Sequence, residues 1–137
     1  IQAAILRIKL NKLDEYTAER QKAASYYTQA FAGCKKISTP ATGENTTHVF
    51  HQYTLVLNNV DREGLQKHLG DKGIPAPIYY PVPLHMQKAY IDPRYNEGDF
   101  PVTEKLCKEV ISLPMHTELD EEQLKFITES VLEFVNK

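Results

Sequence analysis

The stretch TTHVFHQYTLVL, residues 46–57, decides the fold class of this chain, because its β-branched and aromatic residues stand between segments with helical patterns. Its side chains alternate between two faces, which predicts a β-strand with one wetter face. One face carries Val49, His51, Tyr53, Leu55 and Leu57, and the other carries Phe50, Gln52, Thr54 and Val56. A strand flanked by helices predicts an α+β domain, in which a small sheet is packed with helices.

The residues before this strand predict one long N-terminal helix. Residues 1–32 contain no proline or glycine and are rich in residues that favour helices, and Gly33 stands where a left-handed residue can end the helix. The first third of this helix is apolar nearly all round, through Ile1, Ala3, Ala4, Ile5 and Ile8. Such a helix needs burial on more than one side, so we expect something outside this chain to cover it.

The residues after the strand predict a series of short elements. Asp61 and Asp120 can each cap a helix, and Gln123 stands where it completes a capping box with Asp120. Pro101 suits the first position of a helix. The predicted elements are a helix over 61–72, a short strand over 74–80, a proline-stiffened loop over 80–85, a helix over 101–110, a short strand over 111–113 and a helix over 120–135.

Size and composition limit the classes of protein to which the chain can belong. A length of 137 residues suits one domain, and 42% hydrophobic with 25% charged residues argues against a disordered or membrane-spanning chain. The net charge of −2 argues against nucleic acid or an anionic membrane as a partner. Cys34 and Cys107 form no CxxC pair, which fits the reducing cytoplasm. The chain starts at Ile1 without a targeting pattern, so we expect a piece of something longer.

Most residues that could take part in catalysis or metal binding are better explained by a structural role. His48 and His51 are three apart on the predicted strand and would point to opposite faces, so we expect no metal site. No glycine-rich phosphate loop or nucleophile elbow is present, and Cys107 fits an apolar helix face. The acidic run 120–122 suits the first turn of a helix, where the helix dipole favours negative charge.

The exception is the segment YYPVPLH, residues 79–85. The phenols of Tyr79 and Tyr80 and the imidazole of His85 are amphipathic groups on a loop stiffened by prolines, which suits the wall of an active site. We therefore keep Tyr79, Tyr80 and His85 as candidates for such a wall. The alternative is a rigid connector whose tyrosines pack on the sheet.

Four stretches resemble the sugar-nucleotide aminotransferases of the DegT/DnrJ/EryC/StrS type, which are pyridoxal-phosphate enzymes of the aspartate aminotransferase fold. They are IQAAIL (residues 1–6), HVFHQY (48–53), GIP with YPVPLH (73–85) and FPVTEK with SLPMH (100–116). They follow the order of the family's motifs and span nearly the whole chain. Together they are a strong signal, although each one alone is weak.

The resemblance implies that residues 1–137 form the smaller, C-terminal domain of a fold-type I enzyme, without the large cofactor-binding domain. The family's Schiff-base lysine lies upstream, and none of the twelve lysines here matches it by motif, so no catalytic residue is expected in this segment and its cofactor-binding residues stay unknown. His85 and Tyr80 match positions at the active-site edge, where the family's small domain faces the amino donor or the sugar nucleotide, and Tyr79 replaces the family's usual histidine. The resemblance therefore implies that His85, Tyr80 and Tyr79 are the candidate substrate-binding residues.

The reaction implied for the intact protein is transfer of an amino group, commonly from glutamate, to a keto group on a nucleotide-linked sugar, by a homodimer that uses pyridoxal phosphate. Two alternatives remain open on the sequence. One is a sugar dehydratase of the same family, which differs at the upstream lysine position. The other is a freestanding binding or interaction module built on the same α+β unit.

Overall fold

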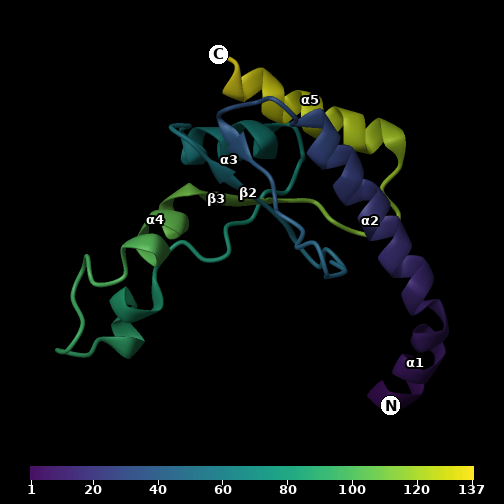
Figure 1. Cartoon of the computed structure of the whole chain (residues 1–137), viewed down its shortest axis with the longest axis horizontal. Helices are drawn as coiled ribbons and strands as arrows, with labels where there is room; N and C mark the ends of the chain where they lie inside the picture. Colours follow the sequence, from purple (N-terminus) through teal and green to yellow (C-terminus); the bar gives the residue numbers. More distant parts are fainter.

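The computed structural model describes residues 1–137, and its centre is a three-stranded antiparallel sheet (Figure 1). The strand order is β1 (Ile37–Ser38), β2 (Tyr53–Leu57) and β3 (Val110–Leu113). In the register of β2 and β3, Tyr53 pairs with Leu113 and Leu55 with Ile111. Directly paired residues share a face of the sheet, so these four side chains form one apolar surface.

Three helices cover this apolar surface: α2 (Leu13–Ala30), α3 (Arg62–Asp71) and α5 (Glu121–Val135) (Figure 1). Helix α5 contacts both α2 and α3, and α3 also contacts β3. The core is one contiguous cluster that includes the fully buried Tyr27, Tyr53, Leu55, Leu57, Leu65, Leu69, Ile111 and Val131. The predicted α+β architecture, a small sheet packed with helices, is confirmed.

The predicted helix caps are present where the sequence placed them. The Asp61 carboxylate accepts a hydrogen bond from the Gly64 N–H at 3.0 Å. At the start of α5 the Asp120 carboxylate accepts from the Gln123 N–H at 2.8 Å, and the Gln123 side chain accepts from the Asp120 N–H at 3.2 Å. These bonds satisfy N–H groups that have no partner within the helix.

The N-terminal helix is not the single unbroken helix that the sequence predicts. It consists of α1 (Gln2–Lys9), a 3₁₀ turn η1 (Leu10–Lys12) and α2, and no residue of α1 or η1 is buried. The 3₁₀ turn contains Asn11, a residue with low helix propensity, and no tertiary packing holds this stretch in the regular α-helical form. Helix α2 ends at Ala30, and Gly33, three residues further on, has φ of +84°, a left-handed conformation that glycine adopts without strain.

Two strand predictions were wrong. The strand begins at Tyr53 rather than Thr46, and Phe50 just before it has φ of +47°, which breaks the strand. His48 and His51 therefore lie on a loop, not on opposite faces of a strand. Residues 74–80 form no strand, because Pro75 and Pro77 have no N–H for a ladder. Only the Pro77 carbonyl joins β3, by accepting a hydrogen bond from the Ser112 N–H at 2.9 Å. The structure adds β1, which is too short to show a pattern.

Residues 84–109 form an arm that extends away from the helical layer (Figure 1, green, lower left). It contains the 3₁₀ turns η2 (Leu84–Met86) and η3 (Lys88–Tyr90) and the helix α4 (Pro101–Glu109). The Arg62 guanidinium of α3 donates to the Cys107 carbonyl and so ties α4 to the rest of the domain. Across the whole chain, the helices are too short or too polar to cross a bilayer.

Candidate functional site

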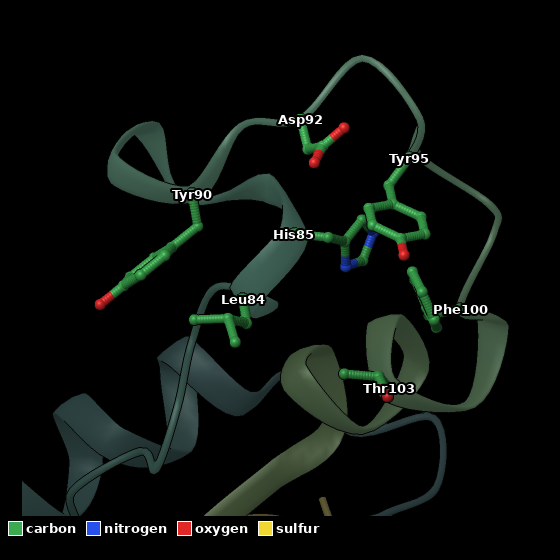
Figure 2. A pocket seen from close by; sticks show the side chains of 7 residues that line it. All are labelled: Leu84, His85, Tyr90, Asp92, Tyr95, Phe100 and Thr103. Carbon is green, nitrogen blue, oxygen red and sulfur yellow. The ribbon is translucent and has the colours of Figure 1, made fainter.

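The arm encloses an open cavity of about 390 Å³, and Figure 2 shows the side chains around it. It lies between the turns η2 and η3, the loop that follows them and the first turn of α4. Seven residues line it: Leu84, His85, Tyr90, Asp92, Tyr95, Phe100 and Thr103. Three aromatic rings, an imidazole and a carboxylate in one hollow give a mainly apolar lining with a few polar groups, which is typical of small-molecule sites.

His85 is the most enclosed polar side chain of this cavity, with 9% of its side chain exposed. Its ring centroid lies 4.8 Å from that of Phe100, and the Phe100 ring in turn lies 5.5 Å from the Tyr95 ring. Figure 2 shows the imidazole directed towards Tyr95 and Phe100. The Nε2 atom of His85 lies 3.0 Å from Oε1 of Glu104, a residue of α4.

Glu104 connects the loop to the helix that closes the cavity. Its side chain is 10% exposed, and it accepts hydrogen bonds from the Gly98 N–H at 2.9 Å and the Phe100 N–H at 3.2 Å as well as contacting His85. Burial acts to raise the pKa of the Glu104 carboxyl, but the N–H groups of Gly98 and Phe100 and the His85 ring outweigh it, so this pKa is lowered from its ordinary value. Glu104 is therefore ionised at neutral pH.

The far side of the cavity carries an exposed ion pair. The Arg94 guanidinium contacts the Asp92 carboxylate through Nη2 at 2.6 Å and through Nε at 3.0 Å. These hydrogen bonds lower the pKa of Asp92. Arg94 also lies over the Tyr95 ring, 5.6 Å from its centroid. Asp92 is thus a carboxylate that already has a cationic partner.

The structure separates the three site residues that the sequence selects. His85 lines the cavity of the arm, whereas Tyr79 lines a second hollow beside β3, together with Pro77 and Met115. Tyr80 lines neither hollow and is 71% exposed. The rings of Tyr79 and Tyr80 lie edge to face at 5.8 Å. The two tyrosines are therefore neighbours of one another, and His85 belongs to a different surface.

Sequence reasoning missed Glu104 and most of the cavity lining. Glu104 lies 19 residues after His85, and nothing in the spacing predicts their contact. A weaker signal was present, because a glutamate in the first turn of a helix that begins with proline can bond back to the N–H groups before it, much as in a capping box. Tyr90, Asp92 and Tyr95 stand in a polar, turn-prone stretch that carries no motif.

Comparisons with known proteins agree over almost the entire chain. Residues 1–132 match the model of the DegT/DnrJ/EryC1/StrS aminotransferase family. The chain is 42% identical over 136 residues to the pleiotropic regulatory protein of Geobacillus stearothermophilus. It is 34% identical over 137 residues to the dTDP-3-amino-3,4,6-trideoxy-alpha-D-glucose transaminase of Streptomyces venezuelae. The fold of DesV from S. venezuelae, solved in complex with a ketimine intermediate, matches with a TM-score of 0.93 at 34% identity.

The chain belongs to the DegT/DnrJ/EryC1/StrS aminotransferase family. It spans about a third of the length of these relatives: the matches cover 98–100% of this chain, but 36% of the two curated proteins and 36% of the DesV chain. Members of the family are pyridoxal-phosphate enzymes, as the resemblance of the four motifs implies.

The residues around the cavity of the arm do not fit pyridoxal phosphate. That cofactor needs a lysine for its Schiff base and several donors for its phosphate. No lysine or arginine lines the cavity, and the N–H groups of Gly98 and Phe100 at the start of α4 are already bonded to Glu104. The cavity of the arm is suited instead to a group that packs on aromatic rings and bonds to an imidazole.

Proposed function

We propose that residues 1–137 are the smaller, C-terminal domain of a pyridoxal-phosphate-dependent aminotransferase, which transfers an amino group from glutamate to the keto group of a sugar nucleotide. The match of residues 1–132 to the aminotransferase family carries this proposal. A relative named as a dTDP-sugar transaminase supports the substrate class. In this proposal the Schiff-base lysine and the phosphate contacts belong to a larger domain outside this chain, and the enzyme works as a homodimer in the cytoplasm.

The role that we assign to this domain is to bind and orient the substrate. His85 presents its imidazole at the cavity of the arm, and Tyr79 and Tyr80 present aromatic rings that are 44% and 71% exposed. Exposed aromatic side chains held on a stiff backbone lose little entropy when a ligand or another domain packs on them. We assign substrate contact to His85, Tyr80 and Tyr79 on this basis, and no covalent step to any residue of the chain.

The experiment uses the full-length protein, expressed from the complete reading frame that contains this chain. Purified protein is incubated with L-glutamate and a dTDP-linked 3-keto sugar, and 2-oxoglutarate and the amino sugar are measured by mass spectrometry. Formation of both products in equal amounts supports the proposal. Glutamate turnover without an amino sugar, or loss of water from the sugar without transfer of nitrogen, contradicts it.

The 137-residue chain alone is the matched control. After incubation with pyridoxal phosphate and reduction with borohydride, the full-length protein should carry the label on a single lysine outside residues 1–137. The isolated chain should show no stoichiometric label on any of its twelve lysines. Stoichiometric labelling of one lysine within this chain would place the cofactor on this domain and contradict the proposed division of roles.

A further inference from the structure

Three groups of the chain, two backbone N–H groups and one imidazole nitrogen, lie within hydrogen-bond distance of the Glu104 carboxylate. An ionised carboxylate can only accept hydrogen bonds. Oε1 of Glu104 accepts from the Gly98 N–H at 2.9 Å and the Phe100 N–H at 3.2 Å, and Oε2 accepts from the same Gly98 N–H at 3.0 Å. Oε1 also lies 3.0 Å from Nε2 of His85, so Nε2 must carry the proton of that hydrogen bond.

The other nitrogen of the same ring is left without a partner. Nδ1 of His85 has no hydrogen bond within the chain. It is also not buried, so solvent or a ligand can reach it. In a neutral imidazole whose Nε2 is protonated, Nδ1 carries the lone pair and accepts hydrogen bonds. His85 lines the cavity of the arm, and its Nδ1 is not buried, so a ligand in this hollow can approach the lone pair.

We propose that Glu104 is a positioning residue for His85: it fixes the orientation of the imidazole with Nε2 protonated, so that Nδ1 faces a ligand as a hydrogen-bond acceptor. The proposal rests on the proposed function, in which His85 contacts the substrate. The group recognised at Nδ1 is therefore a donor, such as a hydroxyl of the sugar or a protonated amine. A carbonyl or phosphate oxygen does not satisfy Nδ1 in this tautomer.

A simpler role for Glu104 is to hold the loop against α4 by accepting hydrogen bonds from backbone N–H groups. Another carboxylate of the same loop accepts such a bond without contacting His85, and it serves as a comparison. Asp99 lies in the same loop, and its carboxylate accepts a hydrogen bond from the Asn96 N–H at 2.7 Å without contacting His85. If Glu104 acted only as a loop anchor, Glu104→Gln and Asp99→Asn would have similar effects. If Glu104 acts through His85, only Glu104→Gln changes the protonation of the ring.

The first test reads the tautomer directly, in full-length protein labelled with ¹⁵N-histidine. The ring signals of His85 are assigned by their loss in His85→Ala, and the nitrogen shifts and couplings show which atom carries the proton. At a pH where the ring is neutral, we expect the Nε2-protonated tautomer in the unmodified protein and in Asp99→Asn, and a mixture with the Nδ1-protonated tautomer in Glu104→Gln, because the new amide can donate to Nε2. An Nδ1-protonated ring in the unmodified protein overturns the inference.

The second test is a double-mutant cycle on glutamate-dependent turnover. Glu104→Gln should lower kcat/KM by about tenfold, as expected for loss of a charged hydrogen bond that orients a contact group. Asp99→Asn should stay within about twofold, which is usual for a surface substitution. On a His85→Ala background, Glu104→Gln should cause no further loss. An equal loss on both backgrounds shows that Glu104 acts independently of His85 and overturns the inference.

The two tests separate this inference from the proposed function. The tautomer is measured without substrate, so this result tests the positioning role of Glu104 independently of the reaction that the protein catalyses. An Nε2-protonated His85 that shifts in Glu104→Gln supports the positioning role even if glutamate turnover is absent, and absence of turnover then contradicts only the proposed function. If Glu104→Gln does not fold, Glu104→Asp, whose shorter side chain keeps the charge but draws it away from His85, takes its place in both tests.

Discussion

His85 and Glu104 are held together by the local chemistry of one helix start. Glu104 stands in the first turn of α4, where the helix dipole favours a carboxylate and where the preceding N–H groups have no helical partner. Phe100 also packs against the imidazole, with 4.8 Å between the ring centroids. The ring is therefore fixed by one hydrogen bond and one aromatic contact.

Replacing His85 tests its assignment to the substrate. In the full-length protein, His85→Ala should lower kcat/KM by tens-fold, because losing a hydrogen bond to a substrate costs about 1–3 kcal/mol. His85 lies outside the core cluster, so the melting temperature should change little. Lys88→Ala, an exposed residue of the neighbouring turn, is the control. A large drop in melting temperature with normal kinetics would favour a purely structural role.

Glu104 should make the stability of the protein sensitive to acid. Because its pKa in the folded chain is lowered from 4.5, the ionised form stabilises the folded state above that value, and this contribution is lost as pH falls through the folded pKa. The melting temperature of the unmodified chain should exceed that of Glu104→Gln near pH 7, and the gap should narrow as the pH falls below 4.5 and through the lowered pKa of Glu104. Glu122→Gln, on an exposed residue of α5, is the control. A gap that is constant with pH would contradict this interpretation.

At the scale of elements, α5 contributes more buried residues than any other helix. Leu124, Ile127, Thr128, Ser130, Val131 and Val135 are all buried on it. Two tyrosines connect the other layers: the Tyr27 hydroxyl of α2 donates to the Pro114 carbonyl at 2.9 Å, and the Tyr53 hydroxyl of β2 bonds to the Thr28 hydroxyl at 2.8 Å. Burial raises the pKa of both phenols, which therefore remain protonated.

The capping box of α5 should have a measurable share in the stability of the domain. Asp120→Ala removes the acceptor for the Gln123 N–H and should lower the free energy of unfolding by about 1 kcal/mol. Asp120→Asn keeps a side-chain oxygen in the same place and is the control, with a much smaller effect. Urea unfolding of the 137-residue chain measures both. Equal destabilisation by the two substitutions would show that charge, not the cap, is the source of the effect.

At the scale of the whole molecule, the apolar N-terminus has no partner within this chain. Figure 1 shows α1 projecting away from the sheet and the helices that cover it. Leu6, Ile8 and Leu10 are 64%, 74% and 67% exposed. Burying such a side chain stabilises a protein by about 1.5–3 kcal/mol, so a surface of several of them favours association.

We expect the isolated chain either to self-associate through α1 and η1 or to leave these turns frayed. Light scattering at several concentrations and amide exchange of residues 2–10 distinguish the two results. Combining Leu6→Glu with Leu10→Glu should abolish any self-association without changing protection of the core strand β2. A monomer with strong amide protection from Gln2 to Leu10 would contradict the expectation and favour a freestanding module.

The sequence by itself determined the helix caps, the core face of one strand and the family. Helix caps such as Asp61 and the pair Asp120 and Gln123 depend on groups three residues apart, so their hydrogen bonds are visible in the spacing. Alternation identified the core face of β2, and the motifs identified the family over residues 1–132. The predicted strand over 74–80 was wrong, because an extended segment becomes a strand only when a neighbouring strand supplies hydrogen-bond partners. Pro75 and Pro77 have no N–H to donate to such a neighbour.

The tertiary structure alone decided which candidate site residues meet. Tyr79, Tyr80 and His85 are close in sequence, yet His85 turns into the cavity of the arm while Tyr79 faces another hollow. Glu104 meets His85 across 19 residues because the loop between them returns to the first turn of α4. No periodicity encodes that return, since it depends on the path of an irregular loop that is fixed by hydrogen bonds from Gly98 and Phe100 to one carboxylate.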